Sequence, residues 1–227
     1  MDGTMNNMNE IVKQVMDKLI EMQNGTLYQV TEQDTYDIPL GISNRHIHLS
    51  QQDLEVLFGK NYELTNMKDL VQPGQFACKE TVTVCGPKGA IEKMRVLGPV
   101  RKQSQVEILS GDNFKLGIKA KPGMSGELTG TLGATIVGPR GSVQLQEGVI
   151  VAKRHIHMTT EQAKKFGVHD GQEVSIVCNG TRPGVLHDVV IRANNNSALE
   201  CHVDTEEANA LGLDGNSLIQ ILNHQCK

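Results

Sequence analysis

The stretch Arg45-His46-Ile47-His48-Leu49-Ser50 is followed later in the chain by a second copy of its pattern, Arg154-His155-Ile156-His157-Met158-Thr159. Alternate side chains of a β-strand lie on one face, so each His-x-His places two imidazoles side by side. A strand can present metal ligands in this way. The shared arginine and hydroxyl residues favour two related metal-binding strands over surface histidine pairs left by an old duplication.

Each copy ends in a residue that can begin a short helix. Ser50 and Thr159 are N-cap residue types, and Gln162 occupies the capping-box position relative to Thr159. Gly59 and Gly167 end these helices soon afterwards. Both copies therefore predict a strand, a cap and a helix, in two related barrels or sheets that contribute ligands near a shared boundary.

The composition favours a chain of many short strands. Among 227 residues there are 23 glycines and 7 prolines, and they separate short β-branched runs. Aromatic residues make up only 3% of the chain, so aliphatic side chains must fill the interior. Together with the two strand-to-helix corners, these features predict a mainly β fold with two β-barrel domains capped by short α-helices.

Charge, hydropathy and cysteine usage exclude several classes of protein. A net charge of -4 offers no basic surface for nucleic acid. No apolar run approaches the roughly 20 residues that a membrane helix requires, and the N-terminus lacks the apolar core of a secretory signal. Five cysteines without a C-x-x-C pair fit a reducing compartment, so we expect a cytoplasmic protein.

The N-terminal region differs from the rest of the chain. Residues 5–23 place apolar side chains at helical spacing, which predicts an amphipathic N-terminal helix that ends at Asn24-Gly25. A polar segment then leads to the first strand near Ile38. Such a helix either packs on its own domain or docks on another protein, and the polar linker favours docking.

Two further residues are candidates to complete two metal sites. His202 would add a third imidazole to His155 and His157, and three histidines leave room for water or substrate on a catalytic zinc. Glu107, which lies in an otherwise apolar strand, is the candidate carboxylate for His46 and His48. The alternative for Glu107 is a place on the solvent face. His169, His187 and His224 have no partner pattern and are expected to be solvated, and strand alternation turns Cys201 away from a metal that His202 faces.

Cations in the central region suggest an anionic substrate. Arg101 follows the rigid corner Gly98-Pro99, and a guanidinium held beside a metal is suited to an oxyanion such as phosphate. Lys88 and Arg95 add to this cationic set. The alternative for Arg101 is an ordinary arginine in a surface loop. Neither a P-loop pattern nor a G-x-G-x-x-G after a strand is present.

Several motifs together carry a resemblance to a known family. They are Ile42 to Ser50, Gln72 to Ala77, Leu97 to Arg101 with Gln105-Val106-Glu107, and Gly148 to Met158. In order and spacing the chain resembles the PduL-type phosphate propanoyltransferases, the phosphotransacylases of bacterial microcompartments, from about Ile38 to Ile221.

The resemblance implies two β-barrels with a dinuclear zinc site between them and transfer of an acyl group between coenzyme A and inorganic phosphate. It implies that His46, His48 and Glu107 hold the zinc that meets the coenzyme A sulfur, and that His155, His157 and His202 hold the second. Arg101 would bind phosphate. Coenzyme A would lie against Ile42, Ser43 and Asn44, with Lys88 and Arg95 near its phosphates and Asn209 as a weaker candidate.

The resemblance also implies a division of the chain. Residues 1–25 would be an encapsulation peptide, 26–36 a linker, 37–44 with 153–224 one β-barrel, 45–60 with 80–152 the second β-barrel, and 61–79 a two-stranded lid. The N-terminal helix would lead the enzyme to shell or core proteins of a microcompartment. We also expect a homo-oligomer.

One segment departs from the family pattern. At this point the family is expected to read close to Pro-Val-Arg-Asp-Ser-Gly-Asp. This chain has Lys121-Pro122-Gly123-Met124-Ser125-Gly126-Glu127 instead, and so lacks the arginine and the aspartate of that motif. The acyl group can therefore be propanoyl or acetyl.

No Ser-His-Asp or Cys-His arrangement supplies a nucleophile, so direct transfer to phosphate in a ternary complex is the expected mechanism. Two alternatives remain: a zinc-dependent acyl-CoA hydrolase, and a non-catalytic metal-binding adaptor of a microcompartment.

Overall fold

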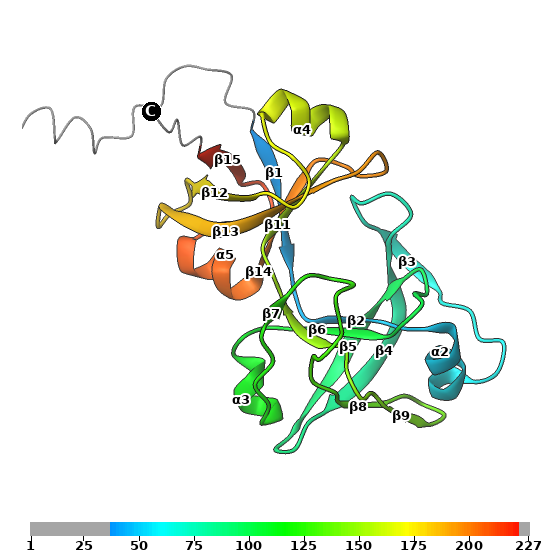
Figure 1. Cartoon of the computed structure of the whole chain (residues 1–227). Helices are drawn as coiled ribbons and strands as arrows, with labels where there is room; N and C mark the ends of the chain where they lie inside the picture. Colours follow the sequence, from blue (N-terminus) through cyan, green and yellow to red (C-terminus); the bar gives the residue numbers. More distant parts are fainter. Residues whose placement is uncertain (1–36, 223–227) are drawn as a thin grey trace, which may run out of the picture. The chain divides into compact units, whose positions relative to one another are not determined.

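A computed structural model of the chain describes residues 37–222 (Figure 1). The predicted amphipathic helix, its linker, His224 and Cys226 lie outside these residues. Within them the chain is mainly β, as its glycine-rich, β-branched sequence predicts. The strands form two sheets, one closed and one open.

The closed sheet is a barrel with the strand order β1-β14-β11-β13-β12-β15, and β15 pairs with β1. Its strands are β1 (Ile38–Ser43), β11 (His155–Met158), β12 (Glu173–Cys178), β13 (Gly184–Ala193), β14 (Glu200–Asp204) and β15 (Leu218–Leu222). The first described strand therefore joins the last section of the chain, as the family resemblance implies. The chain leaves the barrel after β1 and returns to it at β11.

The second sheet runs in the order β7-β10-β6-β2-β5-β4-β8-β9, with β3 beside β4. Its strands are β2 (His46–His48), β3 (Asn66–Asp69), β4 (Phe76–Cys85), β5 (Ala90–Gly98), β6 (Gln105–Ile108), β7 (Pro122–Gly123), β8 (Thr135–Val137), β9 (Ser142–Gln144) and β10 (Val149–Ala152). β3 pairs with β4 in an antiparallel hairpin, and the lid over residues 61–79 stays a prediction.

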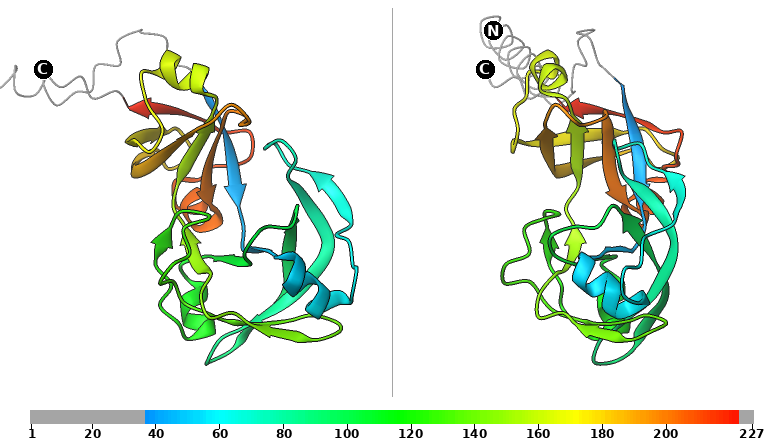
Figure 2. Two further views of the ribbon diagram at one scale, coloured as in Figure 1. Left: turned by 45° about the vertical axis from the view of Figure 1, so that its right-hand side comes forward. Right: turned by 90° about the vertical axis from the view of Figure 1, so that its right-hand side faces the viewer.

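Unlike the barrel, the second sheet bends around its core without closing (Figure 2). An isolated β-bridge between Leu132 and Val149 connects the segment before β8 with β10. β7 has two residues, and Pro122 has no N–H to donate to another strand, so the ladder ends there. A mainly β fold with a barrel is thus confirmed, and the region expected to form the second barrel is a curled, open sheet.

Between residues 37 and 222, four short helices cap the sheets: α2 (Gln51–Phe58), α3 (Asp112–Leu116), α4 (Thr160–Phe166) and α5 (Thr205–Leu211). The Ser50 side chain accepts a hydrogen bond from the Asp53 N–H, and Thr159 and Gln162 form the predicted capping box. Gly59 and Gly167 end α2 and α4 as predicted. Among the described residues, no helix has the length and apolar character needed to cross a membrane.

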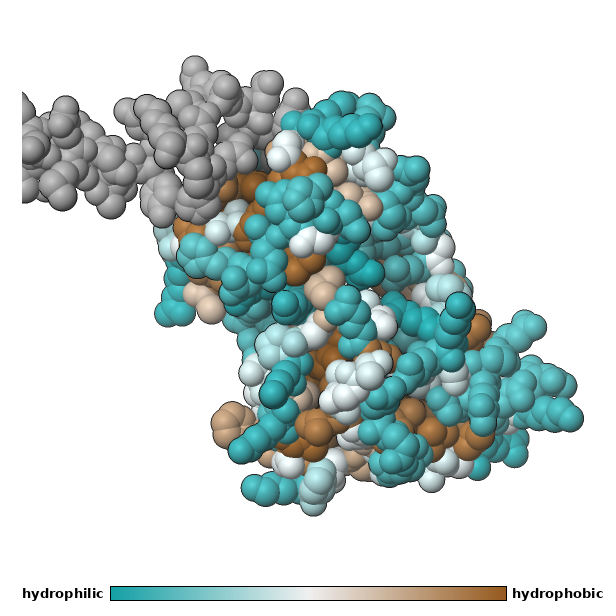
Figure 3. Space-filling view, viewed as in Figure 1, coloured by the Kyte–Doolittle hydropathy of each residue, from teal (hydrophilic) through white to brown (hydrophobic). Residues whose placement is uncertain are grey.

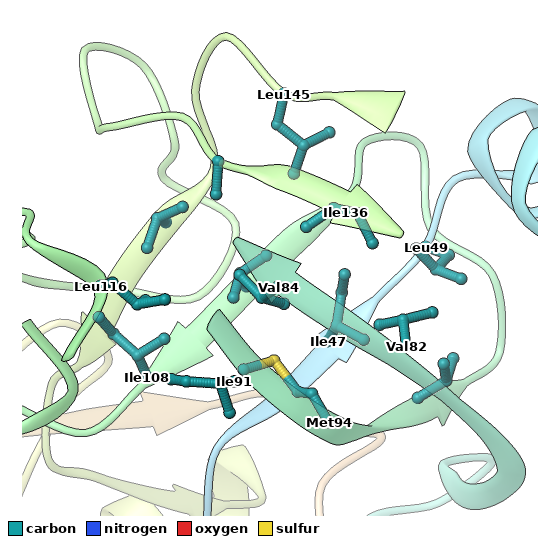
Figure 4. Packing of buried hydrophobic residues seen from close by; sticks show 14 of the residues in the cluster. Ile47, Leu49, Val82, Val84, Ile91, Met94, Ile108, Leu116, Ile136 and Leu145 are labelled. Carbon is teal, nitrogen blue, oxygen red and sulfur yellow. The ribbon is translucent and has the colours of Figure 1, made fainter. Parts of the chain in front are cut away.

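Each sheet has its own aliphatic core. Ile47, between the two histidines of β2, is fully buried among Val84, Met94 and other residues of the curled sheet (Figure 4). Ile156 has the same place in β11 and is fully buried in the barrel core. Because neighbouring residues of a strand face opposite ways, burying each isoleucine turns the flanking imidazoles away from the core. On the side of the molecule that Figure 3 shows, hydrophobic residues form separate patches among hydrophilic ones.

Candidate active site

The first group of candidate ligands joins two strands of the curled sheet. His46 and His48 lie on β2, and Glu107 lies opposite His46 on the neighbouring β6. Their potential ligand atoms lie within 4.8 Å of one another, and His46 Nε2 is 3.4 Å from Glu107 Oε2. Glu107 is only 7% exposed, so it does not occupy the solvent face that was its alternative.

The second group belongs to the barrel. His155 and His157 lie on β11, and His202 lies opposite His155 on β14. Their potential ligand atoms also lie within 4.8 Å of one another. Cys201, the residue before His202, is fully buried in the barrel core, as strand alternation predicts. The second group is therefore made of imidazoles, without a thiol.

Backbone carbonyls orient several of these rings. His46 Nδ1 lies 2.8 Å from Asn44 O, His48 Nδ1 lies 3.2 Å from Leu97 O, and His155 Nδ1 lies 2.8 Å from Lys153 O. A carbonyl oxygen only accepts, so each Nδ1 carries a proton. In the neutral form of each ring, the lone pair is therefore on Nε2. Histidines that bind metals are commonly held by a carbonyl in this way.

Burial keeps most of these imidazoles neutral. It lowers the pKa of His48 to about 3, with help from the charges of His46 and Arg101. It likewise lowers the pKa of His155 to about 4 and that of His157 to about 3. A neutral imidazole is the form that binds a metal ion, so these side chains need not lose a proton at pH 7.

Glu107 and His46 shift each other's pKa values in opposite directions. Burial disfavours the charged form of Glu107, but the adjacent His46 holds the pKa of this carboxyl well below its usual range. Against the effect of its own burial, His46 has a raised pKa because of the Glu107 carboxylate. Glu107 is therefore an anionic oxygen donor at neutral pH.

The two groups fit divalent metal ions. His155 Nε2 and His157 Nε2 lie 3.2 Å apart, and two neutral lone pairs at this distance repel unless a proton or a cation lies between them. His157 Nδ1 is buried and has no hydrogen-bond partner among residues 37–222. Imidazole nitrogens and a carboxylate oxygen are the donors that zinc and other first-row divalent ions accept.

Arg101 lies at the same site and is held from two directions. Its backbone N–H donates to Leu49 O at 2.9 Å, and its Nη1 donates to Ser125 Oγ at 2.9 Å. Gln105 Nε2 donates to the same Ser125 Oγ and also to Glu107 Oε1. The segment that departs from the family pattern thus contributes Ser125 to a hydrogen-bonded chain that connects Arg101 with the first ligand group.

Both ligand groups and Arg101 line one cavity of about 790 Å³. Ile42, Ser43, Asn44 and Arg95, predicted to contact coenzyme A, also line it. Lys88 and Asn209 do not. Lys88 packs its side chain beside Gly117, and Asn209 lies on α5. The contacts with coenzyme A expected for these two residues stay predictions, and the lining of the cavity does not support them.

Sequence reasoning assigned no role to three further residues at the cavity. Glu200 Oε2 lies 2.6 Å from His202 Nε2, and Gln72 Nε2 donates to the same oxygen at 3.2 Å. Arg192 also lines the cavity. The alternation of Glu200 with His202 was a usable signal, whereas the places of Gln72 and Arg192 depend on contacts between distant parts of the chain.

Fold and site together define a β-barrel protein with two groups of metal-type ligands around one cavity. The family model described as phosphate propanoyltransferase matches residues 39–214. Similar curated proteins, each named phosphate propanoyltransferase, include one from Rhodobacter capsulatus, 52% identical over 84% of this chain and 89% of the relative. One from Thermotoga maritima is 51% identical over 86% and 93% of the two chains, and one from Lachnoclostridium phytofermentans is 46% identical over 93% and 96%.

The chain therefore belongs to the phosphate propanoyltransferase family, and it is an acyltransferase.

Proposed function

We propose that this enzyme is a phosphotransacylase that moves a propanoyl group between coenzyme A and inorganic phosphate, with two bound divalent metal ions. The observation that carries the proposal is the convergence of both ligand groups and Arg101 on one cavity. The relatives' shared name supports propanoyl as the acyl group, and acetyl remains a second substrate to test.

The metal ions proposed are zinc. His46, His48 and Glu107 would hold one ion, and His155, His157 and His202 the other. When bound, such ions lower the pKa of a thiol and stabilise negative charge on a carbonyl oxygen. This chemistry suits a reaction in which the coenzyme A thiolate leaves and an oxyanion develops.

Arg101 supplies the anion-binding part of the proposal. Its guanidinium would hold phosphate so that one phosphate oxygen reaches the thioester carbonyl carbon. The new C–O bond forms, the C–S bond breaks, and the sulfur leaves as the thiolate of coenzyme A. Ser125 and Leu49 hold Arg101 in the site, so phosphate would be oriented before the reaction begins.

Coenzyme A would occupy the cavity beside Ile42, Ser43 and Asn44, with Arg95 close to one of its phosphates. Arg95 Nη1 already donates to the backbone carbonyls of Cys78 and Lys79, which fixes its guanidinium near the cavity. A phosphate of coenzyme A would then use the remaining N–H groups of Arg95.

Direct transfer without an acyl-enzyme is the proposed mechanism. Ser175 hydrogen-bonds His187, but neither residue lines the cavity, so this pair does not offer a nucleophile there. Ping-pong kinetics, or an acyl group trapped on the protein, would contradict direct transfer.

Turnover of propanoyl-CoA with and without inorganic phosphate tests the proposal. A phosphotransacylase forms propanoyl phosphate and coenzyme A only when phosphate is present. A metal-dependent acyl-CoA hydrolase would release free propanoate in its absence, and that result would replace the proposal by the hydrolase alternative.

Metal content is a separate test. We expect two divalent ions per chain in the purified protein, and one in the Glu107→Gln or His157→Asn variant. The control is His169→Asn, because His169 is exposed and lies outside the cavity. Unchanged metal content in both ligand variants would refute the assignment of the ligands.

The cellular place of the enzyme is also a proposal. The amphipathic pattern of residues 5–23 supports a cytoplasmic enzyme that is carried into a bacterial microcompartment. The division into domains and the homo-oligomeric state stay predictions, which limited proteolysis and light scattering can check.

A further inference from the structure

Arg192 lies on β13 directly beside the second ligand group. It is paired in register with His157 on the neighbouring β11, and paired residues of adjacent strands share a face of the sheet. Arg192 is partly exposed and lines the same cavity as Arg101. Its guanidinium is therefore on the cavity side of the barrel.

The guanidinium of Arg192 has no protein partner in the described part of the chain. None of the side-chain hydrogen bonds or ion pairs among residues 37–222 involves it. The other arginines of the cavity differ: Arg45 pairs with Asp112 at 2.9 Å, Arg95 donates to two backbone carbonyls, and Arg101 donates to Ser125. An arginine carries five donors and is always charged, so Arg192 keeps its full binding capacity for a ligand.

The positive charge of Arg192 acts on its neighbours in the cavity. Burial lowers the pKa of Arg101, and the positive charge of Arg192 lowers it further. Arg192 also contributes to the lowered pKa values of His155 and His157. Two guanidinium groups that repel each other in a partly desolvated cavity are unfavourable until an anion joins them.

We propose that Arg192 and Arg101 bind one phosphoryl dianion between them, inorganic phosphate in one direction of the reaction and acyl phosphate in the other. This inference rests on the proposed phosphotransacylase function and adds a second anion-binding residue to it. Arg101 comes from the loop after β5 and Arg192 from barrel strand β13, so the phosphoryl group is held between the two sheets. Planar guanidinium groups bind phosphate oxygens in pairs, and two of them balance a charge of about −2.

Both substrates of the reaction carry phosphoryl groups, so the experiment must separate inorganic phosphate from the phosphates of coenzyme A. In the full-length protein we expect Arg192→Gln to raise the KM for phosphate by about 10- to 100-fold, as loss of a charge-assisted contact does. The KM for propanoyl-CoA stays unchanged. Arg192→Lys keeps the charge without the paired donors, and we expect an intermediate KM for phosphate.

Two further measurements separate phosphate binding from turnover and from coenzyme A binding. Calorimetry of inorganic phosphate binding to the metal-loaded protein gives a Kd without turnover, and we expect the Kd to rise in parallel with the KM. S-Propanoyl pantetheine has no nucleotide phosphates, so a defect in phosphate use that persists with this substrate supports the proposal. Arg182→Gln is the matched control, because Arg182 is exposed in the same barrel and lies outside the cavity.

Several outcomes overturn the inference. An unchanged phosphate KM and Kd in a folded, metal-loaded Arg192→Gln protein contradicts it. A raised KM for propanoyl-CoA that disappears with the pantetheine thioester assigns Arg192 to coenzyme A instead. If Arg192→Gln fails to fold, an unchanged phosphate KM in Arg192→Lys overturns it. Absence of phosphate-dependent turnover in the unaltered protein refutes the proposed function itself, a result distinct from all of these.

Discussion

Gly41 shows how closely the site is packed at the scale of single residues. A Cβ atom at this position would lie 2.8 Å from Glu200 Oε1 and 3.0 Å from His202 Cδ2. Glu200 cannot move freely, because its other oxygen accepts hydrogen bonds from Gln72 and His202. The missing side chain of Gly41 therefore leaves room for the carboxylate that orients His202.

Gly41→Ala should weaken metal binding while leaving the fold intact. The added methyl group displaces Glu200 or His202, and disturbing a residue that supports a ligand costs about 10- to 100-fold in metal affinity. Competition with a chelator measures this affinity, and circular dichroism checks the fold. Gly215→Ala is the control, because no atom lies within 4 Å of its added Cβ. Equal metal affinity in both variants would contradict the role given to Glu200.

Sequence reasoning could find most of the candidate ligand residues because their signal is local. Alternation along one strand places His46 with His48 and His155 with His157, and one charged residue in an apolar strand identifies Glu107. Arg192 carried no such signal. Its place beside His157 follows from the pairing of β13 with β11, and strand register between distant segments is not written in spacing.

At the scale of elements, each His-x-His strand passes directly into a capped helix. β11 is followed by α4, where Thr159 Oγ1 accepts from Gln162 N and Gln162 Oε1 accepts from Thr159 N. These two hydrogen bonds fix the direction in which the chain leaves the ligand strand. The cap is local in sequence, which explains why it was predictable.

Thr159→Ala should lower the free energy of unfolding by about 0.5–2 kcal/mol, because the first turn of α4 loses its side-chain acceptor. Chemical denaturation measures the change. Thr159→Ser retains the oxygen and serves as the control. Equal destabilisation by both substitutions would mean that packing of the Thr159 methyl group, and not the cap, stabilises this corner.

The hairpin of β3 and β4 is joined to the barrel through Gln72, which is only 5% exposed. Gln72 Nε2 donates to Ala198 O at 3.0 Å, and its Oε1 accepts from Ala198 N at 3.2 Å. These contacts connect the curled sheet with the segment that precedes β14. The residues around Gln72 also line the cavity, so the hairpin borders the candidate site.

Gln72→Leu should loosen this hairpin at a cost of about 1–3 kcal/mol. The partly buried N–H and C=O of Ala198 lose their partner, and Glu200 loses one of its two hydrogen bonds. Hydrogen exchange of residues 66–75 should become faster than in the unaltered protein. The control is Met67→Ala, an exposed position on the same hairpin. Unchanged exchange in the Gln72 variant would show that the hairpin is held by other contacts.

At the scale of the whole molecule, the order of the chain explains why the two ligand groups share a cavity. β1 belongs to the barrel, and β2 follows it almost at once in the curled sheet. β10 and β11 make the same passage in reverse. Each His-x-His strand therefore lies immediately after a crossing between the sheets. The sequence indicated two related units. It did not show that only one of them closes, because closure depends on long-range pairing of short strands such as β7 and β9.

Deletion of residues 1–25 should separate catalysis from localisation. Every residue predicted or proposed for the site lies between Ile42 and Asn209, so we expect the truncated enzyme to keep its phosphotransacylase activity. Because the apolar stripe of residues 5–23 is the sequence feature that indicates docking, we expect the truncated enzyme to be lost from purified microcompartments. Quantitative immunoblotting of microcompartment fractions measures encapsulation.

Single substitutions make this last test more specific. Leu19→Asp places a charge in the predicted apolar stripe and should reduce encapsulation, whereas Asp17→Asn changes a position between the apolar ones and should not. Both variants should retain full turnover in solution. Normal encapsulation of both the truncated enzyme and Leu19→Asp would contradict docking and favour a helix that packs on its own protein.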